Sequence, residues 1–374
     1  MKVLFLTPWY PTDEKPNWGV FVREHAIALQ NAGAEVEVWA LCLVKTKDFW
    51  KAKINTTTSN GIKEKQVVVS TRLQQFVYNS PAWQRVLLEN YFKLSKADKP
   101  NLIIGNVGYP AGMWAQELSI RWGVPYLVIE HWSGVQRFMT RSIWGAKLHK
   151  AFKGAKAVLS VSEFLGSQLQ PYKIGRPIIT LPNVVDTTSF AFKPNQPTPG
   201  TVRFCSAQEL SPPKLPFLML EALDALQKKT GITIIYNFVG GGPWEEELKT
   251  KAAKTSVQFQ LLPRQNKAGL ATIIQESDFL IHASSYETFG LIALEALATG
   301  TPVITSNLPS MLEFVTEGRG FTSENKTDYF VAVLEKLIAY PFLHETISAE
   351  ITKSYSREAI GLQLFDICNK YLKK

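Results

Sequence analysis

The segment Ser284–Ile304, SSYETFGLIALEALATGTPVI, contains the most informative local pattern in the chain. An apolar run, Asp278–His282, precedes it, a turn is expected at Phe289–Gly290, and an apolar helix-forming run follows at once. We predict a strand at Asp278–His282 and a helix near 289–299. A strand, a tight turn and a helix in this order are typical of α/β folds with a mostly parallel sheet.

The start of this helix is a candidate anion site. Backbone N–H groups at a helix start are free and the helix dipole favours negative charge there, which suits a diphosphate. Glu287 precedes the helix, and Glu295 lies about 9 Å from the predicted helix start at 289, at roughly 1.5 Å rise per residue. Carboxylates accept hydrogen bonds from sugar hydroxyls, so one ligand can span both residues. The alternative is that both glutamates are ordinary surface residues.

The same alternation of strands and helices occurs twice along the chain, which predicts two α/β domains. The first series has predicted strands at Val3–Thr7, Val36–Leu41, Val67–Ser70, Leu102–Asn106, Tyr126–Ile129, Ala157–Val161 and Ile178–Leu181. The second has predicted strands at Val202–Ser206, Thr233–Val239, Val257–Leu262, Asp278–His282 and Pro302–Thr305, with helices near 216–229, 243–253, 266–275 and 289–299.

The proline-containing segment Asn183–Gly200 interrupts the periodicity and predicts a linker. We therefore place one domain at residues 1–186 and the other at 187–356. The tail from about Arg357 to Lys374 is expected to form an amphipathic helix.

Composition narrows the functional classes. The chain has 374 residues, is 45% hydrophobic and contains three cysteines, too few and too dispersed for a disulfide framework or a metal cluster. Its first apolar run ends at Pro8, too early for a signal peptide or a membrane span, so a reducing cytoplasm is expected.

The net charge of +9 is uneven, since residues 1–182 hold 23 basic and 12 acidic residues whereas residues 183–374 hold 18 and 20. A basic first half can attract nucleic acid, anionic lipid or a phosphate-bearing substrate, or it can be an ordinary solubilising surface.

The stretch ETFGLIALEALATGTPVI resembles the E-x7-E donor motif of the family 4 glycosyltransferases. Further resemblance lies in PNWGVFVREH, VPYLVIEHWSG, LPNVVDTTSF and FVGGGPWEEEL, which occur in the family's order along almost the whole chain. The resemblance implies a GT-B fold, in which two Rossmann-like domains face each other across a cleft and a C-terminal helix crosses back to the first domain. It also implies retaining transfer of a sugar from a UDP- or GDP-sugar to a hydroxyl acceptor, with no obligatory metal.

The resemblance also assigns the site. It places His131 beside the reacting sugar, Glu287 on the donor sugar, Glu295 on the ribose and Lys214 on the diphosphate. The remaining donor-binding residues that it implies are Gly19, Glu209, Leu262, Pro263, Phe289, Gly290, Leu291 and Ile292.

Two departures from the family pattern concern the donor. Glu209 stands where the family has an arginine, and a carboxylate 4 Å from a diphosphate charge is repulsive by about 1–4 kcal/mol. Either Glu209 points away or pairs with a base, or the donor differs, or the chain binds sugar nucleotides poorly. Leu261 replaces a glycine of the loop that contacts the nucleotide base in the family, so the sequence does not identify the base of the donor.

The acceptor is open, and a lipid-linked acceptor at the inner face of the cell membrane is one expectation. The segments WQRVLLENYFKLSKADK (83–99) and FMTRSIWGAKLHKAFKGAK (138–156) mix basic and aromatic residues, which suits either an anionic membrane surface or packing within the domain. Nucleic acid is not expected, because the donor motif has no place in that function. A GT-B sugar-nucleotide epimerase and a catalytically degenerate sugar-nucleotide-binding subunit are the alternatives.

Overall fold

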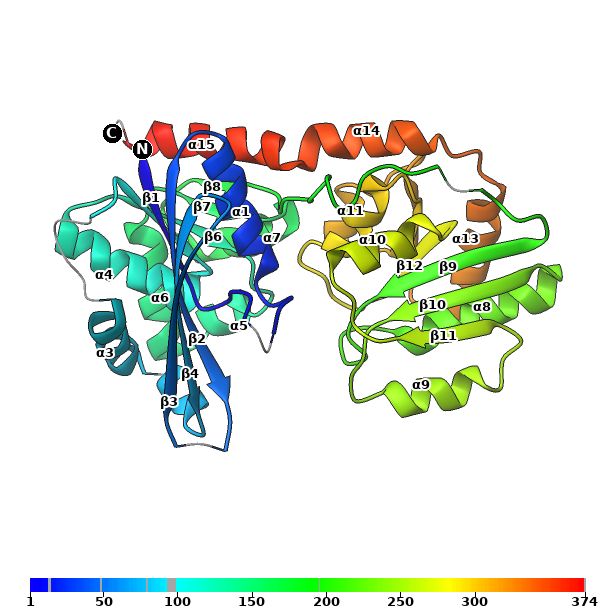
Figure 1. The fold of residues 1–374 in the computed structure, drawn as a ribbon, viewed down its shortest axis with the longest axis horizontal. Coiled ribbons are helices and arrows are strands. Elements are labelled where there is room, and N and C mark those ends of the chain that lie inside the picture. Colours follow the sequence, from blue (N-terminus) through cyan, green and yellow to red (C-terminus); the bar gives the residue numbers. More distant parts are fainter. Residues whose placement is uncertain (13–14, 48, 79, 93–98, 195, 373–374) are drawn as a thin grey trace. The chain divides into compact units, whose positions relative to one another are not determined.

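The computed structural model describes residues 1–12, 15–47, 49–78, 80–92, 99–194 and 196–372. They form two compact units. Unit 1 contains Met1–Val184 together with Arg357–Lys374, and unit 2 contains Val185–Ser356. Each unit has a parallel-type sheet with helices on both of its faces, as Figure 1 shows for each part of the chain.

Unit 1 is built on an eight-stranded sheet in the order β3-β4-β2-β1-β5-β6-β7-β8. Its neighbouring strands are parallel except β3 and β4, which form an antiparallel pair at one edge. The strands are β1 Lys2–Thr7, β2 Glu35–Lys45, β3 Lys51–Ser59, β4 Ile62–Thr71, β5 Leu102–Asn106, β6 Tyr126–Glu130, β7 Val158–Ser160 and β8 Ile178–Thr180. The central strands are buried on both faces, as expected for a parallel sheet covered by helices.

Helices cover this sheet, and most of them follow its strands along the chain. They are α1 Val20–Asn31, α2 Gln74–Tyr78, α3 Pro81–Phe92, α4 Met113–Trp122, α5 Val135–Met139, α6 Ser142–Gly154, α7 Glu163–Leu169 and α15 Arg357–Leu372, with short turns η1 Gly108–Gly112 and η2 Gln170–Tyr172.

The last helix, α15, belongs to unit 1 and confirms the predicted return of the C-terminal helix. It packs against α1 so closely that a Cβ on Gly361 would lie 2.3 Å from the carbonyl oxygen of Ala28. At its first residue, Arg357 Nε donates to Glu24 Oε2 at 2.7 Å. A glycine and a partly buried ion pair therefore fix this helix to α1.

Unit 2 is built on a fully parallel six-stranded sheet in the order β11-β10-β9-β12-β13-β14. The strands are β9 Thr201–Ala207, β10 Thr233–Val239, β11 Gln258–Leu262, β12 Phe279–His282, β13 Val303–Ser306 and β14 Gly320–Ser323. The helices are α8 Pro216–Thr230, α9 Glu245–Ala252, α10 Lys267–Gln275, α11 Leu291–Ala298, α12 Pro309–Leu312, α13 Thr327–Ala339 and α14 His344–Tyr355.

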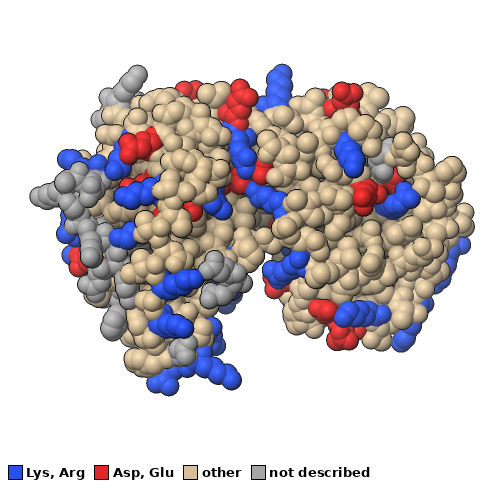
Figure 2. Space-filling model, in the orientation of Figure 1, with Lys and Arg blue, Asp and Glu red and all other residues tan. Residues whose placement is uncertain are grey.

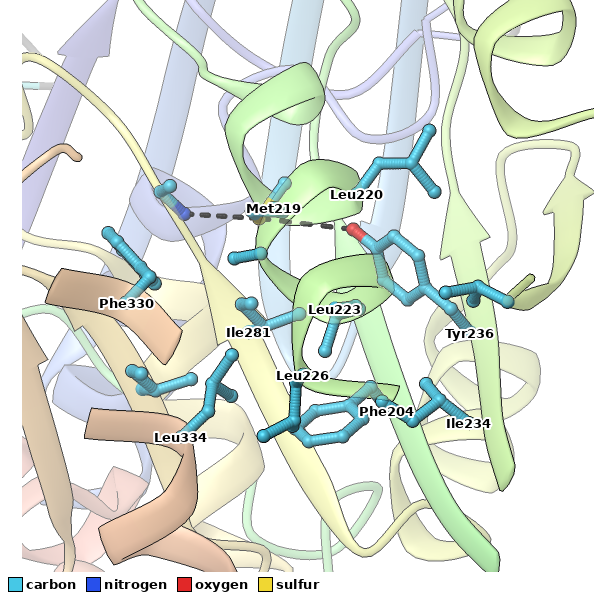
Figure 3. Packing of buried hydrophobic residues seen from close by; sticks show 14 of the residues in the cluster. Phe204, Met219, Leu220, Leu223, Leu226, Ile234, Tyr236, Ile281, Phe330 and Leu334 are labelled. Carbon is cyan, nitrogen blue, oxygen red and sulfur yellow. Dashed lines mark hydrogen bonds between the residues drawn. The ribbon is translucent and has the colours of Figure 1, made fainter. Parts of the chain in front are cut away.

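Met219 of α8 joins the core of unit 2 to the strand ends that carry the site. It packs among Phe204, Leu223 and Ile281 in the buried cluster of Figure 3. Its sulfur accepts hydrogen bonds from Ala283 N–H at 3.2 Å and from Tyr236 O–H at 3.9 Å. The end of β12 is thereby held against the start of α8.

The predicted strands of both series are present, and the two Rossmann-like α/β units confirm the predicted fold class. The elements missing from the sequence prediction include β3, β14, α12, α13 and α14. Strand β3 is an exposed edge strand with the sequence KAKINTTTS. It consists largely of lysine and threonine, so it lacks the apolar face by which a strand is recognised in a sequence.

Candidate functional site

Two loops of unit 2 meet where the adjacent strands β9 and β12 end. Lys214 lies in the loop between β9 and α8, and Glu287 lies in the loop between β12 and α11. The loops are joined by the N–H of Leu215, which donates to Ala283 O at 3.0 Å, and by the N–H of Ser285, which donates to Pro213 O at 2.9 Å. Residues far apart in the sequence are thus brought together by backbone hydrogen bonds.

The side chains of Lys214, Glu287 and His282 form a charged cluster at this edge. The Lys214 ammonium donates a hydrogen bond to Glu287 Oε2, and His282 Nε2 lies 3.5 Å from the same oxygen. The side chains of Lys214 and Glu287 are each 18% exposed, so the pair is only partly reached by water. A ligand that binds here meets a preformed ion pair.

The protonation states of this cluster are set by burial and by charge. Burial alone would raise the pKa of Glu287, but the contact with His282 and the positive charge of Lys214 outweigh it and lower the pKa to about 2. Burial and the Lys214 charge lower the pKa of His282. Near pH 7 Glu287 is therefore ionised and accepts hydrogen bonds only, while His282 is neutral.

Gly290 begins α11 and fixes the approach to its free N–H groups. It has a left-handed backbone with φ of 83°, and a Cβ there would lie 2.0 Å from Met311 Cε. The preceding turn is held by Ser310 Oγ, which donates to the Glu287 carbonyl at 2.8 Å. The helix α11 has eight residues, and its first N–H groups have no partner within the helix. They lie next to the Lys214–Glu287 pair.

The other predicted residues of this segment have distinct environments. Phe289 is buried with its ring 6.0 Å from that of Phe314, so its side chain anchors the turn. Leu291, Ile292 and Glu295 are half-buried on α11. The backbone of this segment, rather than its apolar side chains, is available to a ligand.

Glu209 lies in the loop after β9 but has a different partner. Its Oε1 is 4.0 Å from a terminal nitrogen of Arg264, and both side chains are more than half exposed. The structure thus pairs Glu209 with a neighbouring base, which was one of the three explanations open from the sequence.

The predicted base-reading residues follow β11. Leu262 ends that strand, and its carbonyl accepts from the N–H of Gly240 at 3.0 Å. Pro263 is exposed directly after it. The glycine loop after β10 also lies against the loop after β9, because a Cβ on Gly240 would lie 2.1 Å from Gln208 O.

Unit 1 carries the other two predicted residues. Gly19 precedes α1 with φ of 69°, and a Cβ there would lie 2.3 Å from Trp9 O. His131 follows β6, is 7% exposed, and its ring lies 4.5 Å from that of Phe21. Burial lowers the pKa of His131 well below its ordinary value, the neighbouring His25 adds to this, and Asn183 opposes it. A neutral imidazole is expected near pH 7.

Glu130, which ends β6 in the interior of unit 1, was not among the residues predicted from the sequence. Its carboxylate accepts hydrogen bonds from the N–H groups of Gly108 at 2.8 Å, His131 at 3.0 Å and Trp132 at 2.8 Å. Burial raises its pKa to about 7, against the effect of these bonds. Glu130 therefore fixes the backbone on which His131 lies, and an acidic residue at the end of an apolar strand was its sequence signal.

His282 was also missed, although it ends β12 five residues before Glu287. A histidine at the end of an apolar strand and just ahead of the donor-like motif was the available signal. Across the described ranges, no group of three or more His, Cys, Asp or Glu side chains is arranged to hold a metal ion. No described helix combines the length and apolar character needed to cross a bilayer.

Two family models match the chain in sequence. The model described as Glycosyltransferase Family 4 matches residues 19–189, and the model described as Glycosyl transferases group 1 matches residues 188–357. Together they match residues 19–357.

A curated relative is a GDP-mannose-dependent alpha-(1-6)-phosphatidylinositol dimannoside mannosyltransferase from Mycobacterium tuberculosis. It is 26% identical over 173 residues, which are 44% of this chain and 45% of that protein, so the chain spans less than half the length of this relative.

Solved structures match over nearly the whole chain. Sucrose-phosphate synthase from Thermosynechococcus elongatus has a TM-score of 0.73 with 16% identity and 100% coverage of both chains. HepE of Anabaena in complex with UDP and glucose has a TM-score of 0.67 with 15% identity, covering 99% of this chain and 100% of that one. At these identities the likeness shows the fold, which is GT-B. The chain belongs to the family 4 glycosyltransferases.

Proposed function

We propose that this chain is a retaining glycosyltransferase that moves a sugar from a UDP- or GDP-sugar to a hydroxyl acceptor, with the donor on unit 2 and the acceptor on unit 1. The observation that supports it best is the Lys214–Glu287 pair beside the start of α11. A cation, free N–H groups and an ionised carboxylate side by side suit a ligand that joins a diphosphate to a sugar.

The donor would use each of these groups differently. The diphosphate would accept hydrogen bonds from Lys214 and from the N–H groups of 290–292. Glu287, ionised because its pKa is about 2, would accept hydrogen bonds from the sugar hydroxyls. Glu295, further along α11, would accept from the ribose.

The same groups would act on the leaving group during transfer. As the bond between the anomeric carbon and the diphosphate breaks, negative charge grows on the diphosphate, and Lys214 and the α11 start would stabilise it. A diphosphate oxygen would take the acceptor proton as the acceptor oxygen bonds to the anomeric carbon. His131, neutral through burial, would donate a hydrogen bond to a donor hydroxyl and orient the sugar.

Both nucleotides remain candidates. The M. tuberculosis relative is named as GDP-mannose-dependent, and the HepE structure contains UDP and glucose. Arg264, which contacts Glu209 at the surface, is a second basic side chain besides Lys214 near the strand ends of unit 2. A panel of UDP- and GDP-sugars screened by thermal shift would find the donor, since a ligand at 100 times its dissociation constant stabilises by about 2.7 kcal/mol.

The test of the site compares Glu287→Ala and Glu295→Ala with the wild type. Each should lower donor-dependent activity at least tenfold, because each removes an acceptor for the donor. Glu317→Ala is the matched control, since Glu317 is an exposed glutamate of the same unit. Near-wild-type turnover in both site variants would refute the assignment. Nucleotide-sugar binding without turnover would favour a degenerate subunit, and isomerisation without an acceptor would favour an epimerase.

A lipid-linked acceptor at the inner face of the cell membrane is proposed from the basic surface of unit 1. On α6, Lys147, Lys150 and Lys153 are exposed. Lys147 and Lys150 also line a cavity of about 690 Å³ with Arg85 and Arg121. Each basic residue near anionic lipid contributes about 1 kcal/mol to attachment. Of the earlier segment 83–99, residues 93–98 lie outside the described residues.

Vesicle flotation tests this attachment. The wild type should float with anionic vesicles at low salt and be released at 1 M salt, where the screening length is about 3 Å. The variant with Lys147, Lys150, Lys153 and Lys156 changed to Gln should float less. A variant with the same charge change in unit 2, at Lys228, Lys229, Lys251 and Lys254, is the control. Equal flotation of both variants would refute attachment through α6.

A further inference from the structure

A cavity of about 210 Å³ lies in unit 1 at the carboxyl ends of β1 and β2. Its walls include three indoles: Trp9 follows β1, Trp18 precedes α1, and Trp114 is on α4. Pro8 and Pro110 line it beside them. In parallel α/β sheets, ligands bind outside the carboxyl ends of the strands, so the cavity is placed where a substrate is expected.

The walls of this tryptophan pocket are apolar. Among its described lining residues none is charged, and Gln74 is the one side chain with an amide. That amide donates to Leu43 O at 3.0 Å. The indole N–H of Trp114 donates to Gln84 Oε1 at 3.0 Å. With these two donors already bonded the lining is mainly apolar, so an apolar group would lose fewer hydrogen bonds to water here than a hydroxyl-rich ring.

The pocket is held open by backbone packing. Gly19, with its left-handed φ of 69°, brings the loop that carries Trp18 against the Trp9 backbone, where any Cβ would clash. Lys15 Nζ lies 4.9 Å from the centre of the Trp18 ring. The backbone segments that carry the two indoles are therefore packed against each other.

An aromatic path connects the pocket to the residue proposed to orient the donor sugar. The Trp9 ring lies 6.3 Å from Phe21 in an edge-on contact, and Phe21 lies 4.5 Å from His131. A group in the pocket is therefore one aromatic residue away from the histidine. Such a distance suits the part of an acceptor that adjoins its reacting hydroxyl.

An exposed apolar and basic tip adjoins Gln74 of the pocket along the chain. Gln74 of the pocket is flanked by exposed Leu73 and by Phe76, which is 58% exposed. Phe49 is 62% exposed, and Arg72 lies 5.0 Å from its ring. The exposed lysines of this tip are Lys45, Lys47, Lys51 and Lys53. Figure 2 shows basic side chains gathered at the end of unit 1 that carries the β2–β3 connection. Exposed aromatic rings among lysines are typical of surfaces that meet anionic lipid.

We propose that the tryptophan pocket binds the apolar group of an amphiphilic acceptor, such as the first part of a lipid chain next to its hydroxyl-bearing headgroup. This rests on the proposed transferase function. The volume lies below the roughly 300–1,000 Å³ of sites that hold whole drug-sized ligands, so it takes one substituent while the rest of the chain lies along the exposed tip.

Calorimetry with the full chain tests the pocket, using octyl β-D-glucopyranoside below its micelle concentration and methyl β-D-glucopyranoside as the matched probe. The octyl compound should bind at least tenfold more tightly. Trp18→Ala, which removes a half-buried wall, should reduce this preference to threefold or less. Trp244→Ala, a half-buried indole of unit 2, should leave it unchanged. Equal affinity for the two probes, or an equal effect of both variants, would overturn the proposal.

A second readout does not depend on any variant being stable. In protein labelled with 5-fluorotryptophan, octyl glucoside should shift the ¹⁹F signals of Trp9, Trp18 and Trp114 and leave that of Trp244 in place. Shifts confined to other indoles would overturn the proposal. The outcome is separable from the transferase function: probe binding at these indoles without sugar transfer from any donor refutes the transferase, whereas transfer without apolar preference refutes the pocket.

Discussion

The Lys214–Glu287 pair should be strongly coupled in the stability of unit 2, and a double-mutant cycle measures this. The perturbations are Lys214→Met, Glu287→Gln and both together. Each single change leaves a partner charge only 18% exposed without its counter-charge. We expect a loss of about 2–3 kcal/mol from each single change, somewhat below the values for fully buried pairs.

The size of the coupling follows from the pKa of Glu287. A drop from 4.5 to about 2 corresponds to about 3 kcal/mol at 1.36 kcal/mol per unit. His282 supplies part of this stabilisation of about 3 kcal/mol, so we assign about 1–2 kcal/mol to Lys214. The stability loss of the double variant should therefore be smaller, by about 1–2 kcal/mol, than the sum of the losses of the two single variants. Because the pKa is depressed, the contribution is present above pH 4.5 and is lost as the pH falls through about 2.

The assay is urea unfolding followed by ¹⁹F NMR of 5-fluorotryptophan. Trp244 is the one tryptophan between residues 185 and 356, so its signal reports unit 2 alone. Losses that simply add at pH 7 would refute the reasoning, because they would mean that water screens the pair completely. Coupling that persists unchanged at pH 2 would refute the ionic origin.

Three further predictions concern single positions. Glu209→Arg should tighten nucleoside-diphosphate binding in calorimetry if this position faces the phosphates, and unchanged or weaker binding would show that the carboxylate serves its contact with the neighbouring arginine. Gly290→Ala should lower stability by about 1–2 kcal/mol and weaken the same binding, whereas Gly318→Ala, with φ of 90° and open space, should lower stability only. Glu130 has a raised pKa of about 7, so its contribution to stability is full below about 4.5 and is lost as the pH rises through 7, by up to about 3 kcal/mol. Thermal melts of the wild type between pH 5 and 8 should show this loss, and Glu130→Gln should flatten it.

The elements predicted correctly from the sequence are those whose apolar residues, read along the chain, match the residues that are buried in the folded unit. The apolar runs at β1, β5 and β6 are strands buried on both faces, and they need no knowledge of their neighbours to be recognised. Strand β14, Gly320–Ser323, escaped prediction because its sequence GFTS lacks the apolar run that marks the equally short β12 and β13. Its pairing with β13 depends on Gly320, where a Cβ would lie 2.1 Å from Val303 O, a requirement that only the assembled sheet reveals.

The candidate site divides in the same way. The motif predicted Glu287 and the start of α11, because a strand, a glycine turn and a helix are continuous in sequence. It could not reveal that His282 and Lys214 both lie against Glu287 Oε2. The loops that bring them together follow β9 and β12, which are neighbours in the sheet but are separated in sequence by β10 and β11. The tryptophan pocket was equally invisible, because its walls come from four separate segments.

The attachment of α15 to α1 has a consequence for biogenesis. The ribosome finishes all of unit 2 before it makes Arg357, so unit 1 waits for its last helix while the later unit already has every strand of its own sheet. Domains usually fold in the order in which they emerge. Here the first unit to emerge should be the last to close, and until then the α1 surface around Ala28 stays open to water and to chaperones.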